Sequence, residues 1–214
     1  MRLQTSLPRV VASLTCAGLL LVPAGLRADR GNPTSPHIGY EVVGQVLNPN
    51  PQQSAQYGYL NFVRGLERAT TSAGAAMSET TALLTFYNDT TTERLINNGP
   101  MRLVDRTGTG ALYLGSGGSD FGNPDTFKNG TAVQTYTLRH QVVIDTSTGY
   151  FTTTFEITIT SSTVFQIDGK SYRLGRRGDV YRLIVSGKLT QEGPPSAHIA
   201  GAADGGGVDG LDMN

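Results

Sequence analysis

The stretch that decides the fold class is AVQTYTLRHQVVIDTSTGYFTTTFEITIT, residues 132–160. It divides into two arms, 132–145 and 150–160, in which apolar and polar residues alternate with the period of two that is typical of a β-strand. If Asp145 pairs with Tyr150 across the intervening turn, the apolar faces of both arms coincide. The predicted neighbours are then His140 with Phe155, Leu138 with Ile157, and Tyr136 with Ile159. A shift of one residue would move every apolar side chain to the other face, so the pattern predicts both a long antiparallel hairpin and its register.

The rest of the chain carries shorter alternating segments separated by turn signals. Strands are expected at 38–47, 57–64, 80–88, 92–96, 101–106, 109–114 and 179–189, with a long glycine-rich loop at 115–130. The Asp168-Gly169 pair predicts a type I′ hairpin turn that places Phe165 opposite Tyr172. We also expect a β-bulge or a bend within 160–163, because one extra residue is needed there to keep Ile157 and Tyr181 on one face.

Numerous regular strands and no persuasive long helix predict an all-β fold, either a closed antiparallel β-barrel or a β-sandwich. The long arms of the 132–160 hairpin favour the barrel, because tilted barrel strands are longer than those of a compact sandwich. The strand pattern resembles that of calycin-type and allene-oxide-cyclase/dirigent-type barrels. This resemblance concerns architecture, and fold alone does not determine function.

The two ends of the chain differ in composition from its centre. Residues 1–28 combine Arg2 and Arg9 with a short apolar core at 10–22 and small residues at Ala24 and Ala28, the layout of a secretory signal peptide. We therefore expect a secreted or periplasmic protein with a flexible leader at 29–37 and a single barrel domain at 38–190. Residues 191–214 hold little apolar surface, which predicts a disordered tail.

Removal of the signal would also change charge and cysteine content. The 17 basic residues would fall to 14 with the loss of Arg2, Arg9 and Arg27, against 17 acidic residues, and Cys16, the single cysteine, would be lost. A slightly acidic chain is not typical of nucleic-acid binding, and it has no further long apolar run to predict a membrane span. No cysteine would remain for a disulfide, a thiolate nucleophile or a metal site, and no pattern implies a metal or another cofactor.

His140 is the candidate functional residue, because the hairpin register places its imidazole on an apolar face. In a hollow barrel it would bind a ligand, with Tyr136 and Phe155 beside it, or act as a general base. The alternative is a core histidine whose nitrogens are satisfied by a backbone carbonyl or a tyrosine. No second catalytic partner can be identified from sequence, so His140 is the only catalytic candidate.

Three functions are compatible with these observations. The leading hypothesis is a secreted barrel that binds a small apolar or amphipathic ligand inside the barrel or at its mouth, with the 115–130 loop lining the opening. A barrel cyclase or isomerase acting on a small molecule is the second, since confinement of a reactive substrate leaves no linear motif. A structural or adhesion β-sandwich without a pocket is the third. The sequence does not indicate an oligomeric state.

Overall fold

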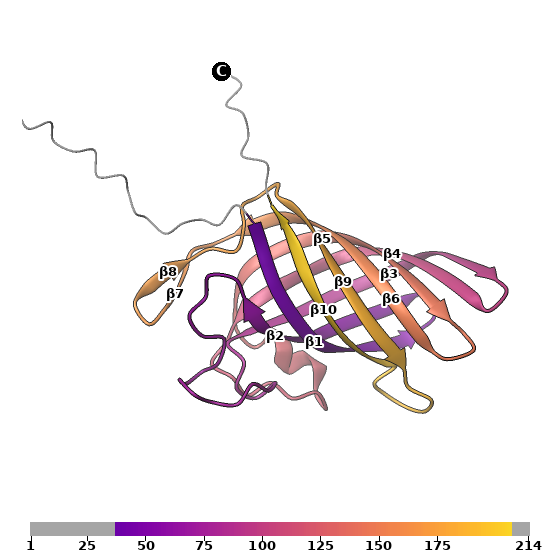
Figure 1. Ribbon diagram of the computed structural model, residues 1–214, viewed down its shortest axis with the longest axis horizontal. Helices are drawn as coiled ribbons and strands as arrows, with labels where there is room; N and C mark the ends of the chain where they lie inside the picture. Colours follow the sequence, from indigo (N-terminus) through magenta and orange to yellow (C-terminus); the bar gives the residue numbers. More distant parts are fainter. Residues whose placement is uncertain (1–36, 207–214) are drawn as a thin grey trace, which may run out of the picture. The chain divides into compact units, whose positions relative to one another are not determined.

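The computed structural model describes residues 37–206, and these form a closed eight-stranded antiparallel barrel (Figure 1). Around the barrel the strands follow the order β1-β10-β9-β6-β5-β4-β3-β2. The barrel strands are β1 (His37–Asn50), β2 (Gln53–Val63), β3 (Leu84–Asn98), β4 (Met101–Leu114), β5 (Thr131–Asp145), β6 (Tyr150–Ser162), β9 (Val180–Leu189) and β10 (Ala197–Gly206). The predicted all-β barrel is confirmed, and the sandwich alternative is wrong.

Two further elements lie outside the barrel wall: a short hairpin, β7 (Phe165–Ile167) with β8 (Lys170–Tyr172), and a 3₁₀ helix, η1 (Pro124–Lys128). Between residues 37 and 206, no helix is long and apolar enough to cross a bilayer. The predicted signal peptide and the leader up to residue 36 lie outside the described residues, and residue 37 already belongs to β1.

The β5–β6 hairpin has the register that its alternation predicts. His140 pairs with Phe155, Leu138 with Ile157, and Tyr136 with Ile159. Beyond this point Thr135 pairs with Ser161, so Thr160 is the extra residue of a bulge, within the segment where one is expected. The β7–β8 turn is also confirmed: Asp168 and Gly169 have φ values of 52° and 76°, and Phe165 pairs with Tyr172.

Strands β3 and β4 are longer than the sequence predicts. The segments expected at 80–88 and 92–96 belong to one strand, β3, although residues 80–83 lie before its start at Leu84. The segments expected at 101–106 and 109–114 likewise form one strand, β4. Gly108, which marks a break in the sequence pattern, lies within β4. A Cβ at this position would lie 2.0 Å from the backbone oxygen of Asp89 on β3. The glycine therefore permits close approach of two strands and does not end either of them.

The prediction of a disordered tail at 191–214 is wrong for residues 197–206, which form β10 and close the barrel between β1 and β9. The composition is misleading here because the strand is built from small residues. A Cβ at Gly201 would lie 2.0 Å from the Ile184 oxygen, and one at Gly205 would lie 2.6 Å from the Tyr181 Cβ. Low apolar content in β10 thus reflects tight contact with β9. Residues 207–214 lie outside the described part.

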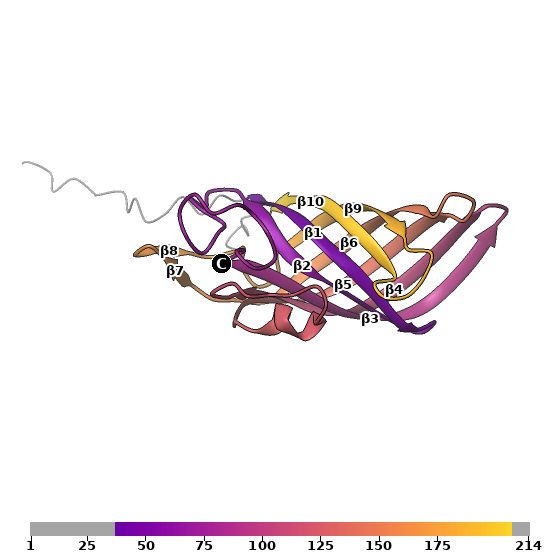
Figure 2. The same ribbon diagram turned by 90° about the horizontal axis from the view of Figure 1, so that it is seen from below.

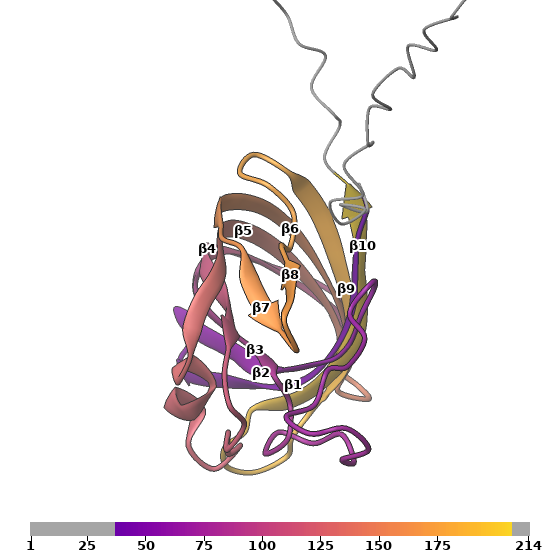
Figure 3. The ribbon, with the colours of Figure 1, turned by 90° about the vertical axis from the view of Figure 1, so that its left-hand side faces the viewer.

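One end of the barrel is covered by the β7–β8 hairpin and the chain that follows it (Figure 3). Phe165 and Ile167 belong to the hydrophobic core, and the Leu174 carbonyl accepts hydrogen bonds from Gln134 Nε2 and Ser162 Oγ. Beneath this cover, Tyr40 donates a hydrogen bond to Tyr181, which donates to Gln134 Oε1. This end of the barrel interior is therefore packed and internally hydrogen-bonded.

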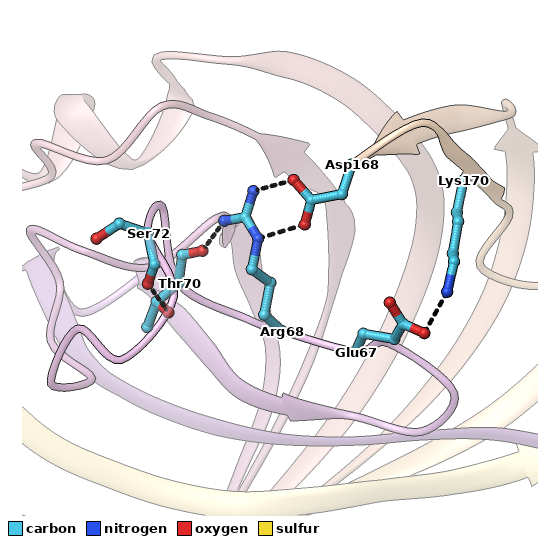
Figure 4. A network of polar contacts seen from close by, with 6 residues as sticks. All are labelled: Glu67, Arg68, Thr70, Ser72, Asp168 and Lys170. Atoms are coloured by element: carbon cyan, nitrogen blue, oxygen red, sulfur yellow. Dashed lines mark hydrogen bonds and ion pairs between the residues drawn. The ribbon is translucent and has the colours of Figure 1, made fainter.

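Two ion pairs attach the β7–β8 hairpin to the segment that follows β2 (Figure 4). The Arg68 guanidinium donates to both carboxylate oxygens of Asp168, at 2.6 and 2.7 Å, and also to the Thr70 carbonyl. Lys170 pairs with Glu67. Because a bidentate arginine–carboxylate pair fixes orientation as well as distance, these contacts define how the hairpin lies over the barrel end.

Candidate functional site

A small cavity lies at the end of the barrel opposite the β7–β8 hairpin. The β3–β4 and β5–β6 turns are at this end (Figures 1 and 2). The volume of the cavity is about 50 Å³. Polar side chains line it from β2, β4 and β5, namely Ser54, Gln56, Arg106 and His140. The side formed by β6, β9, β10 and β1 is mostly apolar, with Phe151, Phe155, Val185, Ile199 and Val46. The exposed residues Asn48 and Leu189 also line it, so the cavity reaches the barrel mouth.

His140 is the polar centre of this cavity. Its side chain is 2% exposed, and its ring meets that of Phe155 edge-on with the centroids 4.8 Å apart. No described residue forms a hydrogen bond with either imidazole nitrogen, so the interpretation as a satisfied core histidine does not hold. Burial lowers the pKa of the imidazole to about 3, with the Arg106 charge adding to this effect and the Asp105 charge opposing it. His140 is therefore neutral at physiological pH, with one N–H donor and one acceptor nitrogen available.

Arg106 is the functional candidate that sequence reasoning missed. It pairs with His140 across the β4–β5 ladder and lines the same cavity. Its Nε donates to Thr92 Oγ1 at 3.1 Å, whereas no described carboxylate forms an ion pair with it. Burial lowers the pKa of its guanidinium, which nevertheless stays charged because arginine titrates far above neutral pH. The missed signal was the phase of β4: an unbroken strand places Val104, Arg106 and Gly108 on the inner face.

Gln56 supplies a further buried polar atom without a partner. Its Nε2 donates to Ser54 Oγ at 2.8 Å and to Thr90 Oγ1 at 3.2 Å, while no described residue donates to its buried Oε1. Four buried side-chain polar atoms in the described part lack a partner, and three of them belong to Gln56 and His140. Because unpaired buried polar groups are costly, their concentration at one cavity makes this cavity the candidate functional site.

The other predicted site residues are not all brought together. Phe155 lines the cavity with His140, but Tyr136 lies closer to the covered end, where its hydroxyl donates to Asn88 Oδ1 at 2.7 Å. Tyr136 is not among the residues that line the mouth cavity. His140 therefore shares the cavity with Phe155, Arg106 and Gln56, and not with Tyr136.

The 115–130 loop does not line the opening, contrary to the expectation from its length. It packs on the outer wall, where Phe121 and Phe127 contact Tyr57 with centroid distances of 6.2 and 5.4 Å. Thr85 Oγ1 fixes it further by donating to the Phe127 carbonyl at 2.7 Å. Phe127 is fully buried by these contacts. The loop is therefore a structural cover for the outer face of β2 and β3.

A larger hollow of about 640 Å³ lies along β5, β6, β9 and β10 and is lined by outer-face residues that include Val143, Lys188 and His198. Within it Tyr150 is 58% exposed, and the Lys188 ammonium lies 4.9 Å from the centre of its ring. None of the partnerless buried atoms belongs to its lining. The mouth cavity is the better candidate site because it contains buried polar atoms without partners, although the outer hollow has the larger volume.

Comparison with known proteins adds no relationship: no family model, curated protein or solved structure matches the chain. Within residues 37–206, no three His, Cys, Asp or Glu side chains are grouped so that they could hold a metal ion. The fold and the chemistry of the barrel mouth are therefore the features from which a function can be inferred.

Proposed function

We propose that this protein binds a small amphipathic molecule at the barrel mouth beside His140. The observation that carries the proposal is a cavity with a polar side, a mostly apolar side and three buried polar atoms that no described residue satisfies. A ligand with one polar end and one apolar end complements both sides. The signal-peptide pattern of residues 1–28 supports binding outside the cytoplasm.

The size of the cavity limits how the ligand binds. A volume of about 50 Å³ is far below the roughly 300–1,000 Å³ of pockets that enclose a whole drug-sized ligand. Only the polar end therefore fits inside the barrel. The remainder lies across the mouth, where Ile144 and the 37%-exposed Leu189 provide apolar contacts. Each buried methylene contributes about 0.8 kcal/mol, so affinity should rise with the length of the apolar part until the mouth is covered.

Binding accounts for the site chemistry better than catalysis does. A cyclase or isomerase needs an acid or base that changes its protonation state near the working pH. With a pKa near 3, the His140 imidazole is a poor base, and the Arg106 guanidinium does not release a proton near neutral pH. Both groups are better suited to donating hydrogen bonds to a ligand. A structural domain without a ligand would leave the partnerless buried atoms of His140 and Gln56 unexplained.

The test is native mass spectrometry of the exported protein, followed by thermal-shift measurements with panels of small lipids and amphipathic molecules. We expect a retained small molecule, or a rise in Tm with at least one amphipathic compound, and loss of the effect in His140→Ala. His198→Ala is the matched control, because His198 lies on the exposed outer face of β10. The proposal fails if neither method detects a ligand, or if the outer-face variant abolishes binding and His140→Ala does not.

A further inference from the structure

The cation at the barrel mouth identifies the polar end of the ligand more closely. Among the residues that line the cavity, Arg106 is the only one with a full positive charge, and no described carboxylate neutralises it. We propose that the ligand is an apolar monocarboxylate, whose carboxylate enters the cavity and is held by Arg106 while His140 donates a second hydrogen bond. This inference rests on the proposed function and specifies its ligand class.

Arg106 carries its positive charge without a carboxylate partner in the described part. Seven arginines in the described part have no carboxylate partner, and Arg106 is the only one of them that is not exposed. Its Nε is occupied by Thr92, and no described residue accepts a hydrogen bond from its two terminal nitrogens. Partial burial removes water molecules from the guanidinium, and at the terminal nitrogens no described group takes their place as a hydrogen-bond partner. Neither terminal nitrogen is among the buried atoms that lack a partner, so both are accessible to a ligand at the mouth. A carboxylate balances the charge and can accept from both nitrogens through two parallel contacts.

The cavity has room and charge for a single negative group. His140 is neutral, so the cavity presents a single positive charge together with one imidazole N–H. This suits a monoanion, since a phosphate dianion would leave a buried negative charge without a counterion. A carboxylate is a flat group of three heavy atoms, comparable with one or two water molecules of about 30 Å³ each, and fits the available 50 Å³.

The apolar surface of the cavity begins beside His140 and extends to the mouth. Phe155 lies against the His140 ring, and Val185 and Ile199 continue the apolar side toward Leu189 at the mouth. A hydrocarbon chain attached to the bound carboxylate would therefore lie along this side and leave the barrel beside Leu189. The buried Oε1 of Gln56 remains available to a ligand hydroxyl or a bridging water molecule.

The experiment compares octanoate, octan-1-ol and octylamine, which share a chain and differ in the polar end, by isothermal titration calorimetry at pH 7. We expect octanoate to bind most tightly and octylamine most weakly. In Arg106→Gln the octanoate affinity should fall about tenfold to a hundredfold, the range for a hydrogen bond to a charged group, while the octan-1-ol affinity changes less than threefold. Arg139→Gln is the control, because it removes the same charge from the outer face of β5.

The outcomes separate this inference from the function on which it rests. If octanoate and octan-1-ol bind equally well, and Arg106→Gln weakens neither, the barrel mouth is a binding site but the carboxylate assignment is wrong. If none of the three compounds binds, and the lipid panel also gives no Tm shift, the proposed function itself fails. Should Arg106→Gln not fold, the order of affinities for the native protein and the octanoate affinity of Arg106→Lys decide. A native preference for octan-1-ol or octylamine overturns the inference.

Discussion

Replacement of His140 by leucine should make the stability of the barrel less sensitive to acid. In the unfolded chain a histidine takes up a proton near pH 6.5, whereas burial lowers the pKa of the folded His140 imidazole to about 3. Between these values the unfolded state binds one more proton than the folded state, so the free energy of unfolding falls as the pH falls. Leucine has a similar volume and no proton to bind, and removes this contribution.

The magnitude follows from the two pKa values. At pH 5 the folded imidazole is still neutral and the unfolded one is about 1.5 pH units below its pKa, which corresponds to roughly 2 kcal/mol at 1.4 kcal/mol per unit. At pH 7 the contribution is close to zero. The wild-type protein should therefore lose about 2 kcal/mol more than His140→Leu between pH 7 and pH 5. Carboxylates that titrate in this range contribute to both proteins and cancel in the difference.

Urea denaturation at pH 7 and pH 5 measures this difference. The chain has no tryptophan and nine tyrosines, so far-ultraviolet circular dichroism and tyrosine fluorescence are the suitable probes. At pH 7 the variant should be at least as stable as the wild type, because it removes two buried nitrogens that have no described partner. His198→Leu is the control, because it removes an imidazole that is exposed on the outer face of the barrel. Parallel pH dependence of wild type and His140→Leu would refute the reasoning and mean that the imidazole is solvated or paired in the folded state.

Three further outcomes are expected. Gly201→Ala should destabilise the barrel by more than about 2 kcal/mol in urea denaturation, because its Cβ meets the β9 backbone, while Ala202→Val on the exposed outer face should cost less than about 0.5 kcal/mol. Arg68→Ala should accelerate amide hydrogen exchange in β7 and β8 without accelerating it in β5, and equal protection in both proteins would contradict the proposed attachment of this hairpin. Phe155→Ala should cost about 3–5 kcal/mol by leaving a cavity in the core, and a loss below 1 kcal/mol would show that the site collapses or is already solvated.

The parts of the fold that could be predicted are those in which large side chains alternate. The faces of β5 and β6 each carry a regular series of apolar residues, so the register of Leu138 against Ile157 follows from the pattern. The same logic fails for β10, where Ala203 and Gly201 face the interior and give almost no hydrophobic signal. Barrel closure is a long-range property: β10 forms a strand because β1 and β9 present unpaired edges to it.

In the candidate site, too, local patterns could be predicted from the sequence and long-range contacts could not. His140 and Phe155 could be placed together because both lie in one hairpin, where sequence separation is small. Arg106 belongs to β4, and its inward position depends on β4 continuing through Gly108, a residue that a local reading treats as a break. The 115–130 loop is correctly located in the sequence but lies elsewhere on the barrel, because Phe127 packs on Tyr57 of β2. The first point depends on the close backbone approach of β4 to β3 at Gly108, and the second on side-chain packing between segments far apart in the sequence.

The most direct test of the central claim is a titration of methyl-labelled protein with octanoate, followed by nuclear magnetic resonance. Val46, Ile144 and Leu189 carry methyl groups that line the mouth cavity, whereas Ile184 is 52% exposed on the outer face of β9 and serves as an internal reference. The account predicts saturable shifts of the three mouth methyl groups with little change at Ile184. Saturable shifts at the outer face alone, or no shift at the mouth at saturating octanoate, would contradict it.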